Sequence, residues 1–212
     1  MLLRVDDLTG THAVAAAIAG VARPGDVIVL AGEMGAGKTA FAQGFGRALG
    51  VTEPITSPTF TLVHSYPLSH RLTLHHADIY RLERTRDIDD LALPELAAFN
   101  GIVLVEWGDV AGSALGDHLE VRLSHVDDLD TDRDTARDTD RDTDLDTDPH
   151  QESDDDLDHD RDTAAGHGTD AVAASEDEFA DPRSREIELR SVGAAWAGRW
   201  DRIARGVERF RC

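Results

Sequence analysis

The sequence predicts an α/β fold with a central, mainly parallel sheet flanked by helices and an antiparallel edge. Two continuous apolar runs, at residues 27–31 and 102–105, are typical of parallel strands buried on both faces. Two alternating segments, 119–123 and 186–189, flank a long acidic stretch and predict an antiparallel pair. The acidic stretch would then be an overgrown hairpin loop at the edge of the sheet.

The chain begins with a short apolar segment at residues 2–5 and an Ala-rich helical pattern. Thr9 or Thr11 can cap this helix, which we expect to run to about Ala22. The Pro-Gly pair at 24–25 ends it, because neither residue continues a helix readily.

A Gly-rich turn follows the strand at 27–31 and leads into a helix from about 38 to 49, which Gly50 ends. Alternation of apolar and polar residues predicts further strands at 60–63 and 72–76.

The net charge of −21 is concentrated in one segment. Residues 126–181 hold 23 acidic residues against 4 arginines, whereas the rest of the chain holds 19 against 17. Large apolar residues are rare in this segment, so burial cannot offset the entropy lost on ordering it. We therefore expect a core at 1–125, an acidic, low-complexity, disordered insertion at 126–182, a closing edge strand at 183–193, and an amphipathic C-terminal helix at 194–212.

An apolar stripe marks the C-terminal segment, formed by Trp196, Trp200, Ile203, Val207 and Phe210 at helical spacing. The opposite side is basic, with five arginines between positions 199 and 211. Two interpretations remain open. The helix either closes the protein's own core or docks a protein or RNA partner.

The remaining composition favours a soluble, cytoplasmic protein without membrane contact. No basic segment followed by an apolar one opens the chain, and no apolar run is long enough to cross a bilayer. The single cysteine, Cys212, excludes an intramolecular disulfide and a cysteine metal site.

The segment GEMGAGKT at 32–39 satisfies G-x-x-x-x-G-K-[ST], directly after a buried strand and at the start of a helix. Glycines let backbone N–H groups face phosphates, and the helix N-terminus favours anions. Lys38 is expected to reach the β- and γ-phosphates, and Thr39 to offer a hydroxyl to Mg²⁺. The predicted fold is therefore P-loop NTPase-like. Its expected nucleotide-binding residues are Gly32, Glu33, Met34, Gly35, Ala36, Gly37, Lys38, Thr39 and Ala40.

Lys38 is the only lysine, against 20 arginines. A GTPase is excluded, because the guanine-reading N-K-x-D motif needs a second lysine. A small-molecule kinase stays open, because Arg81, Arg84 and Arg86 could form a lid.

Two acidic residues end strand-like segments. Asp78 follows LTLHHA, and Glu106 follows IVLV and precedes Trp107, a possible aromatic wall. Ligands bind beyond the carboxyl ends of parallel strands, so both acids could face the phosphates. One would hold Mg²⁺ and the other would orient the attacking water.

The ten histidines are all expected to be structural or exposed. His75 and His76 are adjacent on a strand, so they point to opposite faces and cannot bind one metal together.

The order of these motifs resembles the TsaE (YjeE) family. After the P-loop come SPTF at 57–60 with Tyr66, HADIYRL at 76–82, and VEW at 105–107. Each motif is weak alone, but the ordered set is specific. The resemblance covers residues 1 to about 125 and, more loosely, 185–192.

The resemblance implies a small ATPase, weak alone and stimulated by partners, that uses ATP and Mg²⁺. It would serve formation of N6-threonylcarbamoyladenosine at position 37 of tRNAs that read codons starting with A. The partners implied are the TsaD and TsaB proteins. Contact with tRNA would be indirect, and none with DNA is expected. A nucleotide-gated binding module that needs no hydrolysis remains an alternative.

Roles carried over from the family fall on matching positions. Lys38 and Thr39 would bind phosphate and Mg²⁺, with Asp78 and Glu106 as the carboxylates of the metal site. Lys38, Asp78 and Glu106 would thus be catalytic, and Thr39, Asp78 and Glu106 metal-binding.

The family likeness also extends to a switch-like loop. Ser57 and Thr59 would sense the γ-phosphate, Thr11 would lie near the nucleotide, and Trp107 would complete the nucleotide set. The acidic insertion and the C-terminal helix depart from the family pattern, so no role carries over to them.

Overall fold

A computed structural model describes most of the chain outside the acidic insertion. The described residues are 1–58, 61–68, 71–82, 85–108, 114–126 and 184–212. The predictions for Thr59, for Arg84 and for the insertion beyond Val126 lie outside them.

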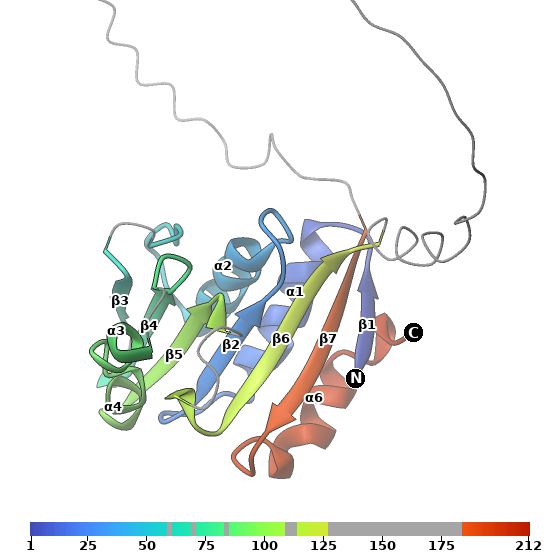
Figure 1. Cartoon of the computed structure of the whole chain (residues 1–212). Coiled ribbons are helices and arrows are strands. Elements are labelled where there is room, and N and C mark those ends of the chain that lie inside the picture. Colours follow the sequence, from blue (N-terminus) through green and yellow to red (C-terminus); the bar gives the residue numbers. More distant parts are fainter. Residues whose placement is uncertain (59–60, 69–70, 83–84, 109–113, 127–183) are drawn as a thin grey trace, which may run out of the picture.

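One seven-stranded sheet organises the protein, in the order β1-β7-β6-β2-β5-β4-β3 (Figure 1). Its four central strands, β6, β2, β5 and β4, run parallel, whereas β3, β7 and β1 pair antiparallel with their neighbours. The strands are β1 Leu2–Val5, β2 Val27–Ala31, β3 Val63–Pro67, β4 Thr73–Asp78, β5 Gly101–Glu106, β6 His118–His125 and β7 Arg185–Val192. The predicted α/β class with a mainly parallel sheet is confirmed.

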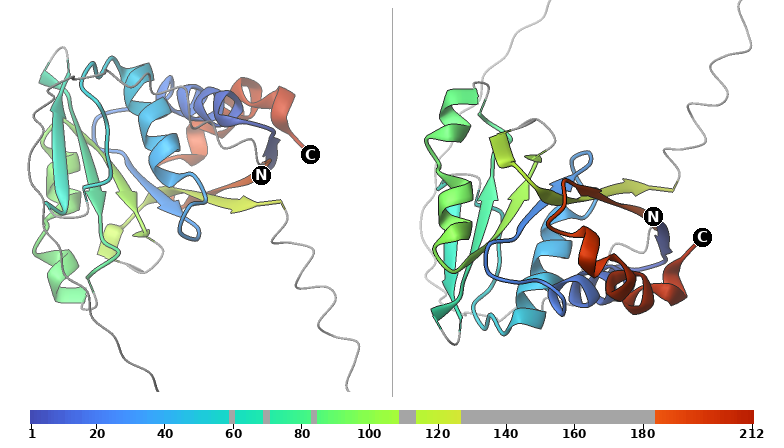
Figure 2. Two further views of the ribbon diagram at one scale, coloured as in Figure 1. Left: turned by 90° about the horizontal axis from the view of Figure 1, so that it is seen from above. Right: turned by 90° about the horizontal axis from the view of Figure 1, so that it is seen from below.

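Helices cover both faces of this sheet (Figure 2). One core lies between the sheet and α1, α2 and the C-terminal helices, and a smaller core lies under α3 and α4. The helices are α1 Leu8–Ala19, α2 Lys38–Leu49, α3 Thr85–Asp89, α4 Leu93–Ala98 and α6 Trp200–Gly206, with 3₁₀ turns at Ala197–Arg199 and Glu208–Phe210.

The antiparallel pair that flanks the insertion forms as predicted, but it is not the edge of the sheet. β7 lies between β6 and β1, so the first strand of the chain forms the edge. β1 is further covered by a bridge between Leu3 and Arg211. The expectation that 183–193 forms the edge strand was therefore wrong, because strand order depends on a long-range pairing.

Two local expectations also need correction. The N-cap of α1 is Asp7, whose carboxylate accepts the N–H of Gly10 at 2.7 Å, and not Thr9 or Thr11. The strand expected at 60–63 begins instead at Val63, because Leu62 adopts a left-handed backbone with φ of 62° that breaks extension.

The C-terminal segment closes the protein's own core. Trp196, Ile203 and Val207 are fully buried, and Trp200 and Phe210 pack against the same cluster. The expected single helix is instead α6 between two 3₁₀ turns.

Arg199 does not belong to the exposed basic side, where the sequence pattern placed it. Its guanidinium is buried and binds both carboxylate oxygens of Asp26, at 2.5 and 2.7 Å. It also donates to the carbonyls of Val21 and Ala195. The reason is tertiary: Asp26 precedes β2 and lies far away in the sequence.

Among the residues that the structure describes, no helix has the length and apolar character needed to cross a bilayer.

Candidate nucleotide-binding site

Three parallel strands deliver the predicted site residues to one end of the sheet. β2 ends at Ala31 and passes directly into the Gly-rich loop, which α2 follows. β4 and β5 end beside it in a register that pairs Asp78 with Glu106. The two acids predicted from separate motifs are therefore direct neighbours.

Strand periodicity directs both carboxylates toward α2. Leu74 and Leu104 belong to the core under α1 and α2, whereas Ala77 and Val105 belong to the core under α3 and α4. Even-numbered positions of β4 and β5 thus face α2. Asp78 and Glu106 share this parity, and Glu106 contacts Thr39 in the N-terminal turn of α2.

Glycines in the loop allow close packing and left-handed backbone. Gly37, with φ of 103°, is the N-cap of α2, and a side chain there would place its Cβ 2.9 Å from Nε of Arg185. A Cβ on Gly32 would collide with the carbonyl oxygen of Leu123. The end of β6 and the start of β7, which flank the insertion, therefore pack against the glycine loop.

The ammonium of Lys38 is folded back within the loop. Its Nζ donates to the carbonyls of Gly32 and Glu33, each at 2.7 Å, and lies 3.6 Å from the ring centroid of Trp107. Lys38 is buried. A cation held by carbonyls and an aromatic face, close to the loop N–H groups, suits an incoming anion.

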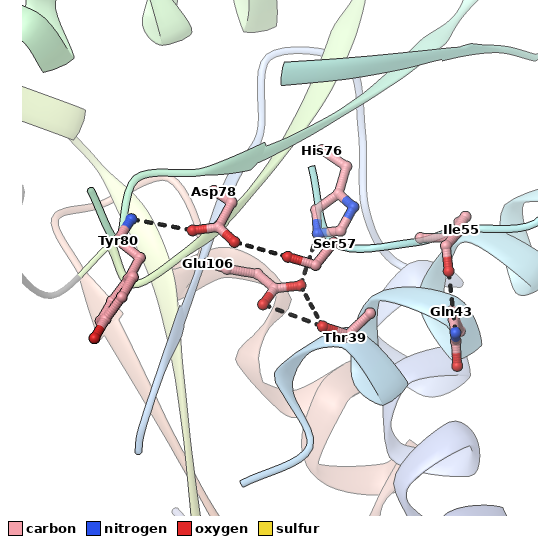
Figure 3. A network of polar contacts seen from close by, with 8 residues as sticks. All are labelled: Thr39, Gln43, Ile55, Ser57, His76, Asp78, Tyr80 and Glu106. Carbon is pink, nitrogen blue, oxygen red and sulfur yellow. Dashed lines mark hydrogen bonds and ion pairs between the residues drawn. The ribbon is translucent and has the colours of Figure 1, made fainter. Parts of the chain in front are cut away.

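Glu106 connects α2 with the strands (Figure 3). The Thr39 hydroxyl donates to Oε1 at 2.9 Å, and Nε2 of His76 lies 2.9 Å from the same oxygen. Only 3 % of Glu106 is exposed. A hydroxyl that donates to a carboxylate keeps its lone pairs available to a metal ion.

Asp78 makes a second, separate set of contacts. Its Oδ2 accepts the Ser57 hydroxyl at 2.7 Å, and its Oδ1 accepts the backbone N–H of Tyr80 at 3.0 Å. The Tyr80 ring packs on Trp107 at a centroid distance of 4.6 Å. The loop that carries Ser57 is therefore tied directly to the acid at the end of β4.

These groups surround one cavity of about 340 Å³. Most of the predicted residues line it: Met34, Gly35, Gly37, Lys38, Thr39, Ala40, Ser57, Asp78, Glu106 and Trp107. Gly32 and Glu33 face Lys38 through their carbonyls, and Ala36 is buried. Thr11 does not line the cavity, because its hydroxyl lies in the first turn of α1 beside the Asp7 carbonyl, 3.3 Å away.

The sequence prediction missed Tyr80 as a lining residue and His76 as a contact of Glu106, and it named Arg81, which also lines the cavity, only as part of a possible lid. His76 is fully buried, as expected of a structural histidine, but it also contacts a carboxylate of the candidate site. Strand parity with Asp78 is the signal that could have found it. His75 does point to the other face, where its Nδ1 lies 2.8 Å from the Ser65 hydroxyl and burial lowers its pKa.

The donor set fits a magnesium nucleotide. No group of three or more histidine, cysteine, aspartate or glutamate side chains converges within the described ranges. Mg²⁺ typically takes one or two protein carboxylates together with substrate phosphates and water, so a dense protein cage is not required. Thr39, Glu106 and Asp78 beside the phosphate loop provide such a set.

The parallel sheet, the glycine loop between β2 and α2, and the paired acids define the class of P-loop NTPase-like proteins. The sequence model described as "Threonylcarbamoyl adenosine biosynthesis protein TsaE" matches residues 5–135. The chain belongs to the TsaE family.

Curated relatives carry the name tRNA threonylcarbamoyladenosine biosynthesis protein TsaE. The chain is 45 % identical over 97 residues to one from Bacillus subtilis, a match that covers 46 % of this chain and 60 % of that protein. It is 44 % identical over 94 residues to one from Treponema pallidum, covering 44 % of this chain and 68 % of that protein. The aligned part thus spans less than two thirds of the Bacillus relative.

The fold is also similar to the crystal structure of YdiB from Bacillus subtilis. The TM-score is 0.54 at 23 % identity, and the match covers 99 % of this chain and 94 % of that chain. At this identity the likeness supports the fold alone.

Proposed function

We propose that this protein is a Mg²⁺-dependent ATPase that supports formation of N6-threonylcarbamoyladenosine at position 37 of tRNAs reading codons that start with A. The observation that carries the proposal is the bond from Thr39, at the start of α2, to Glu106, at the end of β5. It joins the two halves of the proposed phosphate and metal site, and family membership supports the pathway.

Each residue has a role in this proposal. The loop N–H groups and Lys38 hold the phosphates, and Lys38 exchanges its carbonyl and aromatic contacts for phosphate oxygens. Thr39, Glu106 and Asp78 would hold Mg²⁺, which withdraws charge from the phosphates when bound. Asp78, which accepts the Ser57 hydroxyl, would orient water and report the γ-phosphate to the loop. Glu106 fixes the Thr39 hydroxyl.

We further propose that hydrolysis is slow without partners and that TsaD and TsaB are those partners. Tyr80 and Arg81 are exposed at the cavity, and Met34, at the loop tip, is 72 % exposed. A partner protein can therefore reach the mouth of the site. tRNA would be reached through the complex, in the cytoplasm.

The test is replacement of the chromosomal gene by a Lys38→Ala variant, followed by mass analysis of tRNA nucleosides. We expect threonylcarbamoyladenosine to fall to the level of a gene deletion, because no other lysine exists to hold the phosphates. Arg47→Ala, on the same helix but outside the cavity lining, is the matched control and should retain the modification. An unchanged level in Lys38→Ala would contradict the proposal.

Glu106→Gln separates an ATPase from a module that needs only nucleotide occupancy. Loss of the modification with retained ATP binding supports hydrolysis, and full retention supports the module. A small-molecule kinase remains the alternative, and of the three arginines of its predicted lid Arg81 lines the cavity.

A further inference from the structure

His76 lies on β4 and contacts Glu106 from the side of the sheet. Its Nε2 lies 2.9 Å from Oε1 of Glu106, and the residue is fully buried. β4 sets this position: His76 pairs in register with Leu104, two residues before Glu106, while Asp78 pairs with Glu106 itself. His76 and Asp78 thus share one face of β4, and Figure 3 shows the ring directed at the Glu106 carboxylate.

The direction of this contact depends on the tautomer of His76. An ionised carboxylate only accepts hydrogen bonds, so with Glu106 in that form Nε2 is the donor. Nδ1 is buried and has no hydrogen-bond partner in the part of the chain that the structure describes. At this buried position, an Nδ1 without hydrogen destabilises the fold less than an Nδ1–H that lacks an acceptor. The His76 ring therefore makes its hydrogen bond to Glu106 through Nε2 alone.

Two donors from different elements meet on the same oxygen of Glu106. Thr39 approaches Oε1 from α2, on the nucleotide side, and His76 approaches from β4, on the sheet side. The terminal torsion of a glutamate is broad, so the carboxylate plane is not fixed by its own chain. Because His76 lies outside the cavity lining, its bond can hold Oε1 whether or not a nucleotide occupies the site.

We propose that His76 is a positioning residue that fixes the Glu106 carboxylate for the magnesium nucleotide. This inference rests on the proposed nucleotide function and deepens it. A histidine that only filled the core would leave the metal dependence of nucleotide binding unchanged when replaced. A positioning histidine supports that dependence, since groups that orient metal-site residues typically change metal affinity by about 10–100-fold.

The experiment compares three purified variants with wild type. His76→Leu removes the donor, and His76→Gln restores an N–H near the position of Nε2. His75→Leu is the matched control on the same strand, with its side chain on the opposite face. Titration calorimetry measures ATP affinity in Mg²⁺ and in EDTA, and the ratio of the two is the readout. Thermal unfolding reports folding.

We expect His76→Leu to lower the Mg²⁺ enhancement of ATP affinity by about 10-fold or more, with EDTA affinity unchanged. His76→Gln should recover most of the enhancement, and His75→Leu should keep all of it. An unchanged ratio in folded His76→Leu, or equal loss in His75→Leu, overturns the inference alone. If the ATP affinity of wild type is the same in Mg²⁺ and in EDTA, both the proposed function and this inference are contradicted.

A second measurement needs no nucleotide and keeps the inference testable if His76→Leu does not fold. Nitrogen-15 NMR of the nucleotide-free wild type should show a protected Nε2–H of His76 with Nδ1 bare, and Glu106→Gln should shift that resonance. A His76 with hydrogen on Nδ1 alone would overturn the inference.

Discussion

Two buried carboxylates at opposite ends of the central strands are satisfied in different ways. Asp26, just before β2, is 6 % exposed and binds the buried Arg199 through both oxygens. Glu106, at the end of β5, is 3 % exposed and is held by the Thr39 hydroxyl and the His76 ring. Asp26 has a guanidinium partner within the fold, whereas Glu106 is held by a hydroxyl and an imidazole beside a cavity. A carboxylate of the second kind is suited to an incoming cation.

The largest effect on stability is expected for the buried ion pair of Asp26 with Arg199. Asp26→Asn leaves the Arg199 guanidinium buried without its counter-charge. We expect the free energy of unfolding to fall by about 3–5 kcal/mol, measured by urea denaturation. ATP affinity of the folded fraction should not change, because neither residue lines the cavity.

The double variant Asp26→Leu with Arg199→Met is the control for this prediction. Removing both charges should recover much of the lost stability, since buried ion pairs are often replaceable by apolar groups of similar size. A double variant no more stable than Asp26→Asn would show that packing, and not charge pairing, dominates at this position.

The same carboxylate-to-amide change at Glu106 should preserve stability and impair ATP hydrolysis. We expect Glu106→Gln to hold or raise the free energy of unfolding, because a buried charge without an ammonium or guanidinium contact is removed. Partner-stimulated ATP hydrolysis should fall by about 10²–10³-fold, as for other preorganised groups of active sites. A large loss of stability here would contradict the distinction between the two carboxylates.

Glu120 is intermediate between Asp26 and Glu106, because its arginine partners are exposed. The smallest effect on stability is expected when one of these partners is removed. Burial raises the pKa of its carboxyl, but hydrogen bonds and charge from Arg190 and Arg122 outweigh this, so the pKa lies below its usual range. Both arginines are exposed, at 65 % and 44 %. We therefore expect Arg190→Ala to cost only about 0.2–1 kcal/mol near pH 7.

The sign of the pH dependence follows from the lowered pKa of Glu120. Its stabilisation is present above the unfolded-state pKa and is lost as pH falls through the folded-state pKa. Urea denaturation of wild type and Arg190→Ala should therefore converge in acid. A gap between them that stays constant from pH 7 to acid would show that the arginine stabilises through packing.

The phosphate loop could be predicted from the sequence because its determinants are local. Strand, glycine turn and helix follow one another within residues 27–49, and each carries its own pattern. The acids at Asp78 and Glu106 were found for the same reason, since each ends a recognisable strand. The rule that ligands lie at the carboxyl ends of parallel strands placed both acids at one end of the sheet, but their direct pairing in register came only from the structure.

The errors concern contacts between distant segments. A helical pattern placed Arg199 on the solvent side, because the sequence around it does not reveal Asp26. His76 was assigned no role in the site, because its contact with Glu106 crosses from β4 to β5. The edge of the sheet was misassigned because β1 pairs with β7, at the other end of the chain.

The interior position of β7 has a consequence for synthesis on the ribosome. β1 emerges first, yet its only strand partner among the described residues is made last, with Leu2 opposite Glu188. Until residues 185–192 appear, the strand pairs that the structure describes leave β1 without a ladder and β6 with one unpaired edge, and unpaired edges favour aggregation. Arg185 also packs against Gly37, so the glycine loop acquires this support only after the acidic insertion has been translated.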